Sequence, residues 1–161
     1  MRIAVLSDIH DNIWKLEEVL KGLEGVEALL FCGDFCAPFS LKMLADGFPG
    51  PIHVVFGNND GDQFLLTRVA TGAGNVTLHG HFADLTLGDR RIAVTHYPEI
   101  GRPLAASGQY DLVCHGHDHQ YEVERVGEAL RLNPGEVMGR FGASTYAIYD
   151  TETGDVQRHQ V

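Results

Sequence analysis

The fold is decided by the stretch IAVLSDIH, residues 3–10, in which an apolar run turns abruptly into acidic and imidazole side chains. A short continuous apolar run predicts a strand that is buried on both faces, as strands are in parallel sheets. Residues two apart on an extended chain face the same side, so Asp8 and His10 can point toward one ion. The stretch therefore predicts a buried strand with a polar site at its carboxyl end.

The same pattern repeats along the first half of the chain. Apolar runs at 28–32 and 52–56 predict two further buried strands, and amphipathic segments at about 12–23, 38–45 and 63–71 predict helices. This alternation of strands and helices predicts a parallel sheet with right-handed crossovers.

After residue 74 shorter strands dominate. Predicted strands lie at 76–78, 82–87, 92–95, 112–114, 121–126, 129–132, 144–149 and 156–160, with a tight turn at Gly88-Asp89 and one helix near 103–107. We therefore expect an α/β fold, an α/β/β/α sandwich in which two mixed sheets pack face to face with helices outside. The length of 161 residues predicts a single domain, residues 1–161.

The composition narrows the range of partners. The chain has 12 Lys and Arg against 22 Asp and Glu, a formal net charge of −10. This balance argues against a stable nucleic-acid partner, which needs clustered positive charge. No apolar run reaches transmembrane length, and the three cysteines, Cys32, Cys36 and Cys114, predict reduced thiols. We expect a cytoplasmic protein with no membrane partner, and a homo-oligomer remains open.

Potential metal ligands follow nearly every predicted buried strand. Beyond Asp8 and His10, the strand ends carry Asp34, then Asn58, Asn59 and Asp60, then His96, and finally His117 and His119. Sites in α/β proteins form beyond the carboxyl ends of strands. Core packing does not require such a pattern, so it predicts one shared metal site.

The residue types indicate the chemistry. Carboxylate and imidazole suit borderline divalent ions, of which we expect Mn²⁺, with Fe²⁺, Zn²⁺, Ni²⁺ or Co²⁺ as alternatives. The absence of cysteine from the set argues against a structural zinc site. Two ions about 3.5–4 Å apart can share one carboxylate and one hydroxide, and that hydroxide can attack phosphorus. Gly33, Gly57 and Gly116 stand beside ligands and predict tight turns there.

In order and spacing, these residues resemble the motifs of the calcineurin-like metallophosphoesterases. The matching motifs are Asp8-x-His10, Gly33-Asp34, Gly57-Asn58-x-Asp60, His96 and Gly116-His117-x-His119. The chain looks most like the small bacterial and archaeal phosphodiesterases of that superfamily. Residues 133–135, the sequence NPG, are also similar to a late loop of that branch.

The resemblance implies a role for each matching residue. It assigns the first metal to Asp8, His10 and His119, the second to Asn58, His96 and His117, and the bridging position to Asp34. It also places Asp34, Asn58, Asn59 and Asp60 at the catalytic centre and implies a small phosphoester substrate.

Asn59 departs from the family pattern. Many members have a histidine at this position, where it acts as a general acid or a phosphate ligand. An asparagine has no useful proton-transfer pKa, so we expect good leaving groups, a water molecule or the nearby Tyr97 to take over. The expected function is a phosphodiesterase that uses a hydroxide bridging two divalent metals. The alternatives are a promiscuous phosphatase, a protein-interaction scaffold on the same fold, and a hydrolase of another bond.

Several polar residues keep more than one interpretation. Asn12 caps a helix or lies close to the site, and Asp118 either orients a ligand or faces solvent. Arg102 meets either substrate or solvent. His115 is expected to point away from His117, with a supporting role left open.

Four other histidines are not expected to bind metal. His79 and His81 copy the spacing of the ligand pair His117 and His119, but the family pattern places no ligand there. His53 and His159 are interpreted as structural or surface residues.

Overall fold

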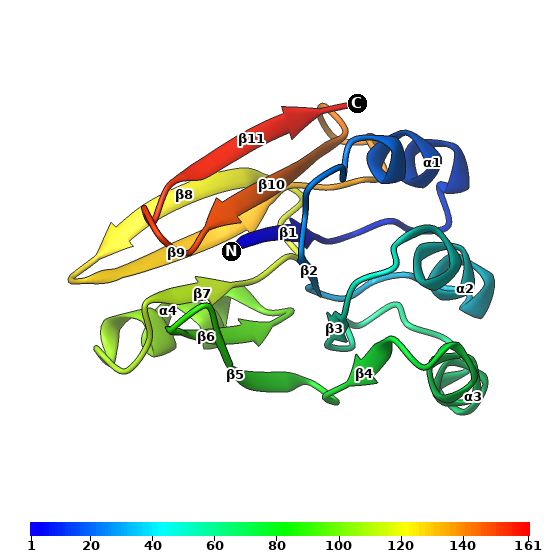
Figure 1. The fold of residues 1–161 in the computed structure, drawn as a ribbon, viewed down its shortest axis with the longest axis horizontal. Helices are drawn as coiled ribbons and strands as arrows, with labels where there is room; N and C mark the ends of the chain where they lie inside the picture. The colour runs from blue at the N-terminus through cyan, green and yellow to red at the C-terminus, as the bar shows by residue number, and fades with distance from the viewer.

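The protein is a four-layer sandwich, as the computed structural model of residues 1–161 shows (Figure 1). One sheet has six strands in the order β11-β10-β1-β2-β3-β4, and the other has five in the order β5-β6-β7-β9-β8. Helices α1, α2 and α3 cover the outer face of the six-stranded sheet, and α4 lies on the far side against the five-stranded sheet (Figure 1). The predicted α/β/β/α class is confirmed.

The elements follow the chain in a simple order. The first half contains β1 (Arg2–Leu6), α1 (Ile13–Lys21), β2 (Ala28–Phe31), α2 (Pro38–Gly47), β3 (Ile52–Val54), α3 (Gln63–Ala73) and β4 (Val76–Leu78). The second half contains β5 (Phe82–Leu87), β6 (Arg90–Thr95), α4 (Pro98–Ala106), β7 (Leu112–Cys114), β8 (Tyr121–Val126), β9 (Ala129–Pro134), β10 (Thr145–Asp150) and β11 (Val156–Gln160).

Burial on both faces explains the apolar run that begins the chain. Along β1, Ala4 and Leu6 point into the core beneath α1, α2 and α3, whereas Ile3 and Val5 point into the core between the two sheets. A third, smaller core lies between the five-stranded sheet and α4. Successive residues from Ile3 to Leu6 are therefore buried on opposite faces of the sheet, which explains why all four are apolar.

The helix expected near 103–107 begins earlier, at Pro98. Proline is favoured in the first helical turn, where its missing N–H costs nothing. The sequence offers two such prolines, and Pro98 takes that role while Pro103 lies inside the helix. Ala105 packs into the third core, and Leu104 packs against it.

The turn at Gly88-Asp89 forms as predicted. Both residues have positive φ, +54° and +61°, and they join the antiparallel strands β5 and β6. This is the geometry of a two-residue hairpin turn. None of the helices is long and apolar enough to cross a membrane.

Parallel pairing places the carboxyl ends of five strands together. Strands β1, β2 and β3 run parallel in one sheet, and β6 and β7 run parallel in the other. Loops from the two sheets join at this edge, because the His117 N–H donates to the Asp8 carboxylate at 3.1 Å and His96 Nδ1 donates to the Cys32 carbonyl at 2.7 Å. The predicted ligands all lie in these loops.

Candidate metal centre

Asp8 lies close to two histidines in the first half of the candidate site. Its Oδ1 lies 3.6 Å from His10 Nε2 and 3.5 Å from His119 Nε2. The two imidazoles are stacked, with ring centroids 5.1 Å apart. Two ligands that each bind one ion at about 2.1 Å lie roughly 3–3.5 Å apart, so these three atoms have the spacing of a shared ion.

Asp34 joins the first half of the site to the second. Its Oδ2 lies 3.5 Å from His10 Nε2 and 3.4 Å from His96 Nε2. Asn58 Oδ1 lies 3.0 Å from His96 Nε2 and 2.9 Å from His117 Nδ1. The structure thus brings all seven predicted ligands into one connected cluster, with Asp34 in its middle.

Two buried atoms of the cluster have no hydrogen-bond partner. Asp8 Oδ1 and His10 Nε2 are both buried and unpaired, although they face each other and their neighbours. An unpaired buried polar group costs about 1–3 kcal/mol, and native proteins rarely leave one without a reason. A cation between these atoms removes that cost, so the donor set fits a metal ion.

The chain holds the ligands in strained backbone conformations. Asp8, His10, Asp34, His117 and His119 all have positive φ, between +43° and +73°. A non-glycine residue in this region costs about 1–2 kcal/mol. Such strain concentrates at functional sites, where the surrounding structure must maintain it.

Asp60 provides much of that support. Its two carboxylate oxygens accept hydrogen bonds from the backbone N–H groups of residues 34, 35, 36 and 57, at 2.7 to 3.3 Å. A carboxylate occupied in this way faces the backbone of the loops. Asp60 therefore connects the loop after β2 to the loop after β3.

Close backbone approach explains the glycines beside the ligands. A Cβ on Gly57 would collide with Asp34 Oδ1, and one on Gly116 would lie 2.6 Å from Asp8 Oδ2 and collide with Ser7 Oγ. Any larger residue at either position displaces a carboxylate of the candidate site. The sequence prediction of tight packing at these glycines agrees with this geometry.

The charges of the cluster compensate one another. Burial alone would raise the pKa of Asp34, but His96 and the hydrogen bonds from Asn59 hold it well below the ordinary value. Burial would lower the pKa of His96, but the Asp34 carboxylate outweighs it and raises the pKa. The Asp8 carboxylate likewise raises the pKa of His10. The two aspartates therefore attract positive charge, as protons or as metal ions.

The second ring nitrogen of each of three ligands also has a partner. His96 Nδ1 donates to the Cys32 carbonyl at 2.7 Å, and His119 Nδ1 lies 2.8 Å from Glu136 Oε2. His10 Nδ1 lies 3.4 Å from Cys36 Sγ. Partners of this kind fix the tautomer and leave Nε2 free for an ion.

Glu136 is the functional residue that the sequence reasoning missed. Its side chain is completely buried, and its other oxygen accepts the backbone N–H groups of Phe141 and Gly142 at 2.5 and 2.8 Å. A carboxylate buried without a cation needs such donors. The one feature of the sequence that could have indicated Glu136 is its position directly after residues 133–135, the loop that resembles the family.

The structure decides several of the open interpretations. Asn12 caps α1, because its side chain accepts the Lys15 N–H, and it also donates to the Met138 carbonyl. Asp118 is exposed, and the hydrogen bonds of His117 and His119 go to Asn58 and Glu136. His115 is buried and accepts from Arg131 Nη1 at 2.8 Å, so it supports β9 and does not face the ligands.

The remaining histidines lie outside the cluster. His53 Nδ1 and His79 Nε2 are 3.0 Å apart on β3 and just after β4, and His81 contacts the Phe56 carbonyl. His159 stacks on Tyr146. Arg102 lines a surface groove of about 450 Å³ together with Pro98, Glu99, Pro103 and Asp118.

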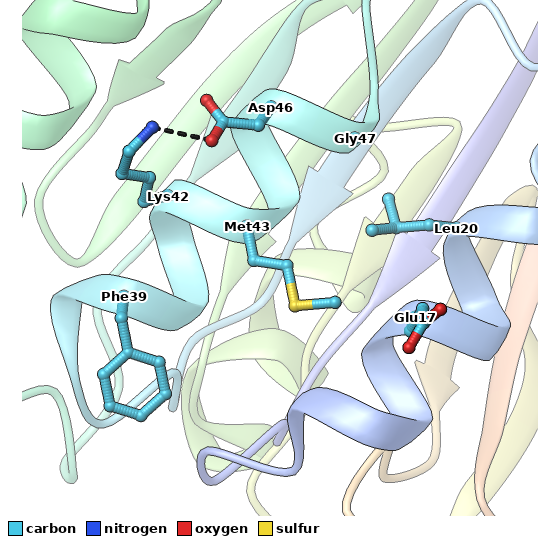
Figure 2. Close-up of a pocket in the computed structure, with 7 residues that line it drawn as sticks. All are labelled: Glu17, Leu20, Phe39, Lys42, Met43, Asp46 and Gly47. Carbon is cyan, nitrogen blue, oxygen red and sulfur yellow. Dashed lines mark hydrogen bonds and ion pairs between the residues drawn. The ribbon is translucent and has the colours of Figure 1, made fainter.

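The largest groove of the molecule is not at the metal centre. It has a volume of about 560 Å³ and lies between α1 and α2, where Met43 of α2 points toward Leu20 and Glu17 of α1 and Phe39 also lines the groove (Figure 2). It contains none of the predicted ligands, and its one ion pair, Lys42 with Asp46, lies within α2. The metal-ligand candidates Asp34, His96 and His10, whose pKa values are shifted, lie at the other site together with the unpaired buried atoms Asp8 Oδ1 and His10 Nε2, which favours that site for the chemistry.

A two-sheet sandwich that gathers aspartate, asparagine and histidine at its joined carboxyl edges is the architecture of a metal-dependent phosphoesterase. Residues 1–154 match the calcineurin-like phosphoesterase superfamily domain, and the chain belongs to this family. The family predicted from the motifs is thereby confirmed.

Relatives cover nearly the whole chain. Phosphodiesterase MJ0936 of Methanocaldococcus jannaschii is 33% identical over 158 residues, 94% of each chain. Phosphodiesterase YfcE of Escherichia coli is 28% identical over 171 residues, covering 94% of this chain and 89% of YfcE. The solved structure of an archaeal phosphodiesterase superposes with a TM-score of 0.93 at 29% identity, over the full length of both chains.

Proposed function

We propose that the protein is a phosphodiesterase that works with two divalent metal ions. The observation that carries this proposal is the cluster of seven ligand side chains, in which buried Asp8 Oδ1 and His10 Nε2 have no protein partner. Membership of the calcineurin-like family and the phosphodiesterase names of two relatives support it.

The seven ligands divide between two positions. Asp8, His10 and His119 would hold the first ion, and Asn58, His96 and His117 the second. Asp34 lies between the two groups and would contact both ions. When bound, two such ions acidify a shared water and neutralise the charge on the phosphate oxygens.

The surrounding residues fix this arrangement. Asn59 donates its backbone N–H and its side-chain amide to the two oxygens of Asp34, both at 2.8 Å. The Asp60 carboxylate accepts the backbone N–H groups of Asp34 and of Gly57, which packs against the Asp34 side chain. We therefore assign both residues the positioning of Asp34, and Asn58 the contact to a phosphate oxygen.

The absence of a histidine at position 59 favours diesters. An asparagine does not protonate a leaving group, so the reaction depends on groups that leave without a proton or on water. Tyr97 offers a hydroxyl beside the site, with its ring edge-on to those of His96 and His117 at centroid distances of 5.1 and 5.4 Å. A diester has one negative charge on its phosphate, so the acidic chain repels it less than it repels a doubly charged monoester.

Mn²⁺ is the ion we expect, because the ligand set is made of oxygen and imidazole donors. The three cysteines are free thiols, which supports a cytoplasmic location. We expect a small phosphodiester as the substrate, since two relatives are named phosphodiesterases.

The test is reconstitution of the protein after chelation. Mn²⁺, Fe²⁺, Zn²⁺, Ni²⁺ and Co²⁺ are added one at a time. With each ion, hydrolysis of the diester bis(p-nitrophenyl) phosphate is compared with hydrolysis of the monoester p-nitrophenyl phosphate and of p-nitrophenyl acetate. We expect the diester to be cleaved fastest and elemental analysis to find two ions per chain. No turnover with any ion would refute the proposal, and faster cleavage of the acetate would indicate a hydrolase of another bond.

A further inference from the structure

A large apolar ring stands in water beside the metal centre. Phe141 is 70% exposed, yet its ring lies edge-on to the metal-ligand candidate His119, with centroids 5.2 Å apart. Leaving a phenylalanine exposed forgoes about 1.5–3 kcal/mol of burial. A single exposed apolar residue is ordinary on a surface, but this one touches a ligand of the reaction centre.

The loop that carries Phe141 is built into the site. Buried Glu136 holds the Phe141 and Gly142 N–H groups with one oxygen and His119 with the other. On the approach to the loop, the N–H groups of Val137 and Met138 donate to the carbonyls of Ser7 and Asp8. The position of the ring is therefore fixed relative to the ligands Asp8 and His119.

A positive charge accompanies the ring. The guanidinium of Arg140 lies over Phe141, 5.3 Å from the ring centroid. The ion pairs of lysine and arginine in the molecule involve Lys15, Lys21, Lys42, Arg90, Arg91 and Arg131, and none uses Arg140. In a chain of net charge −10, an unpaired cation at this place can attract an anionic ester.

We propose that residues 139–142 form a subsite for a planar aromatic substituent of the phosphodiester, an aryl ring or a nucleobase, with Phe141 as the stacking platform. This inference rests on the proposed function, since it concerns the substrate of the same metal centre. Stacking of a base on an aromatic side chain tolerates any planar ring, because every such ring has a π face. Arg140 adds a cation that both the phosphate and the stacked ring can use.

The experiment compares three diesters that share a p-nitrophenyl leaving group. Their other substituent is methyl, phenyl or 5′-thymidine, and each is assayed with the Mn²⁺-loaded wild type and with Phe141→Leu and Phe141→Tyr. Leucine keeps an apolar side chain without a π face, and tyrosine keeps the platform. We expect Phe141→Leu to lower kcat/KM by about 5- to 100-fold, mainly through KM, and Phe141→Tyr to stay within about threefold.

The pattern across the substrates locates the ring. A loss confined to the phenyl or the thymidine ester places that substituent on Phe141 and separates an aryl from a nucleobase preference. A loss shared by all three places the nitrophenyl group there. Both results support the subsite. Phe39→Ala, which removes an exposed phenylalanine from the groove between α1 and α2, is the control and is expected to leave all three values unchanged.

Failure of the subsite is distinct from failure of the proposed function. If the wild type cleaves the esters but Phe141→Leu matches Phe141→Tyr on all three, the aromatic platform is refuted and the phosphodiesterase stands. If the wild type cleaves none of them with any of the five ions, both proposals fall together.

Discussion

Two segments of this chain have the same local sequence pattern and different surroundings. Residues 79–81 and 117–119 both read His-x-His, and both follow a short strand. His117 and His119 contact carboxylates and an amide from loops that follow other strands, whereas His79 pairs with His53. The difference is their position in the sheets, since 117–119 follows the central strand β7 and 79–81 follows the edge strand β4. A metal-ligand spacing is informative only where several strand ends converge.

The electrostatics of the two segments have opposite signs. Near 117–119, neighbouring aspartates raise the pKa of His96 and of His10 above the ordinary value. At the other segment, burial lowers the pKa of His79, and burial together with His79 lowers the pKa of His53. Both clusters contain histidine, but only the one with aspartates attracts cations.

The largest expected effect comes from removing the charge that the two ion positions share. Asp34→Asn keeps the shape of the side chain but loses its negative charge, so we expect kcat/KM to fall by at least about 100-fold with loss of bound metal. Asp118→Asn is the control, because Asp118 is exposed between two ligands and is expected to stay within about threefold. Elemental analysis and diester assays measure both. An Asp34→Asn protein with full activity would contradict the assignment of Asp34.

Glu136 is expected to come next in size. Glu136→Gln has one oxygen left, and it cannot serve both His119 and the N–H groups of the loop. Removing the partner of a metal-binding histidine typically costs about 10- to 100-fold in metal affinity or activity. The Mn²⁺ concentration for half-maximal activity measures this loss, and Glu128→Gln, an exposed glutamate, is the control. If the variant binds Mn²⁺ like the wild type, Glu136 has only a structural role.

The sequence was sufficient for the fold and for the prediction that the candidate ligand side chains cluster, because both follow from local rules. Buried strands read as apolar runs, and their carboxyl ends are where Asp8, Asp34 and His96 appear. The motifs also placed these residues in their family. The seven ligands meet in the structure as the resemblance implied, while their separate roles remain predictions.

What the sequence did not reveal depends on side-chain contacts between distant segments. Glu136 lies in a loop, and nothing in its neighbours along the chain indicates that it reaches His119. The role of Asp60 was also read differently, because a carboxylate in a ligand motif suggests catalysis and its backbone partners 24 to 26 residues away are invisible in the sequence. The start of α4 was misplaced because Pro98 and Pro103 satisfy the same rule.

A substitution of glycine in each segment tests whether the surroundings decide the outcome. Gly116→Ala forces Asp8 and Ser7 aside, so we expect a loss of about 1–3 kcal/mol in stability together with a loss of activity. Gly80→Ala meets no atom within 4 Å but has a φ of +72°, so it should cost about 1–2 kcal/mol of stability with activity retained. Urea unfolding and diester assays separate the two. Equal activity in both variants would remove the distinction between the segments.

The smallest expected effect is the pH dependence of the histidine pair. In the folded chain the pKa of His53 and of His79 lies below the ordinary value, whereas the unfolded chain takes up protons near pH 6.5. Below pH 6.5 the unfolded state therefore binds more protons than the folded state, and stability falls as the pH is lowered toward the folded pKa values.

The metal-free ligands act in the opposite direction. The raised pKa of His10 and His96 gives stability that is present at low pH and is lost as the pH rises through the folded pKa values. His79→Gln isolates the pair from this background, because the ligands are unchanged in the variant. In chelated protein between pH 7.5 and 5.5, we expect the stability of His79→Gln relative to the wild type to improve on acidification. A relative stability that is constant with pH would show that the pair titrates alike in the folded and unfolded chains, and that the contrast with 117–119 is one of position alone.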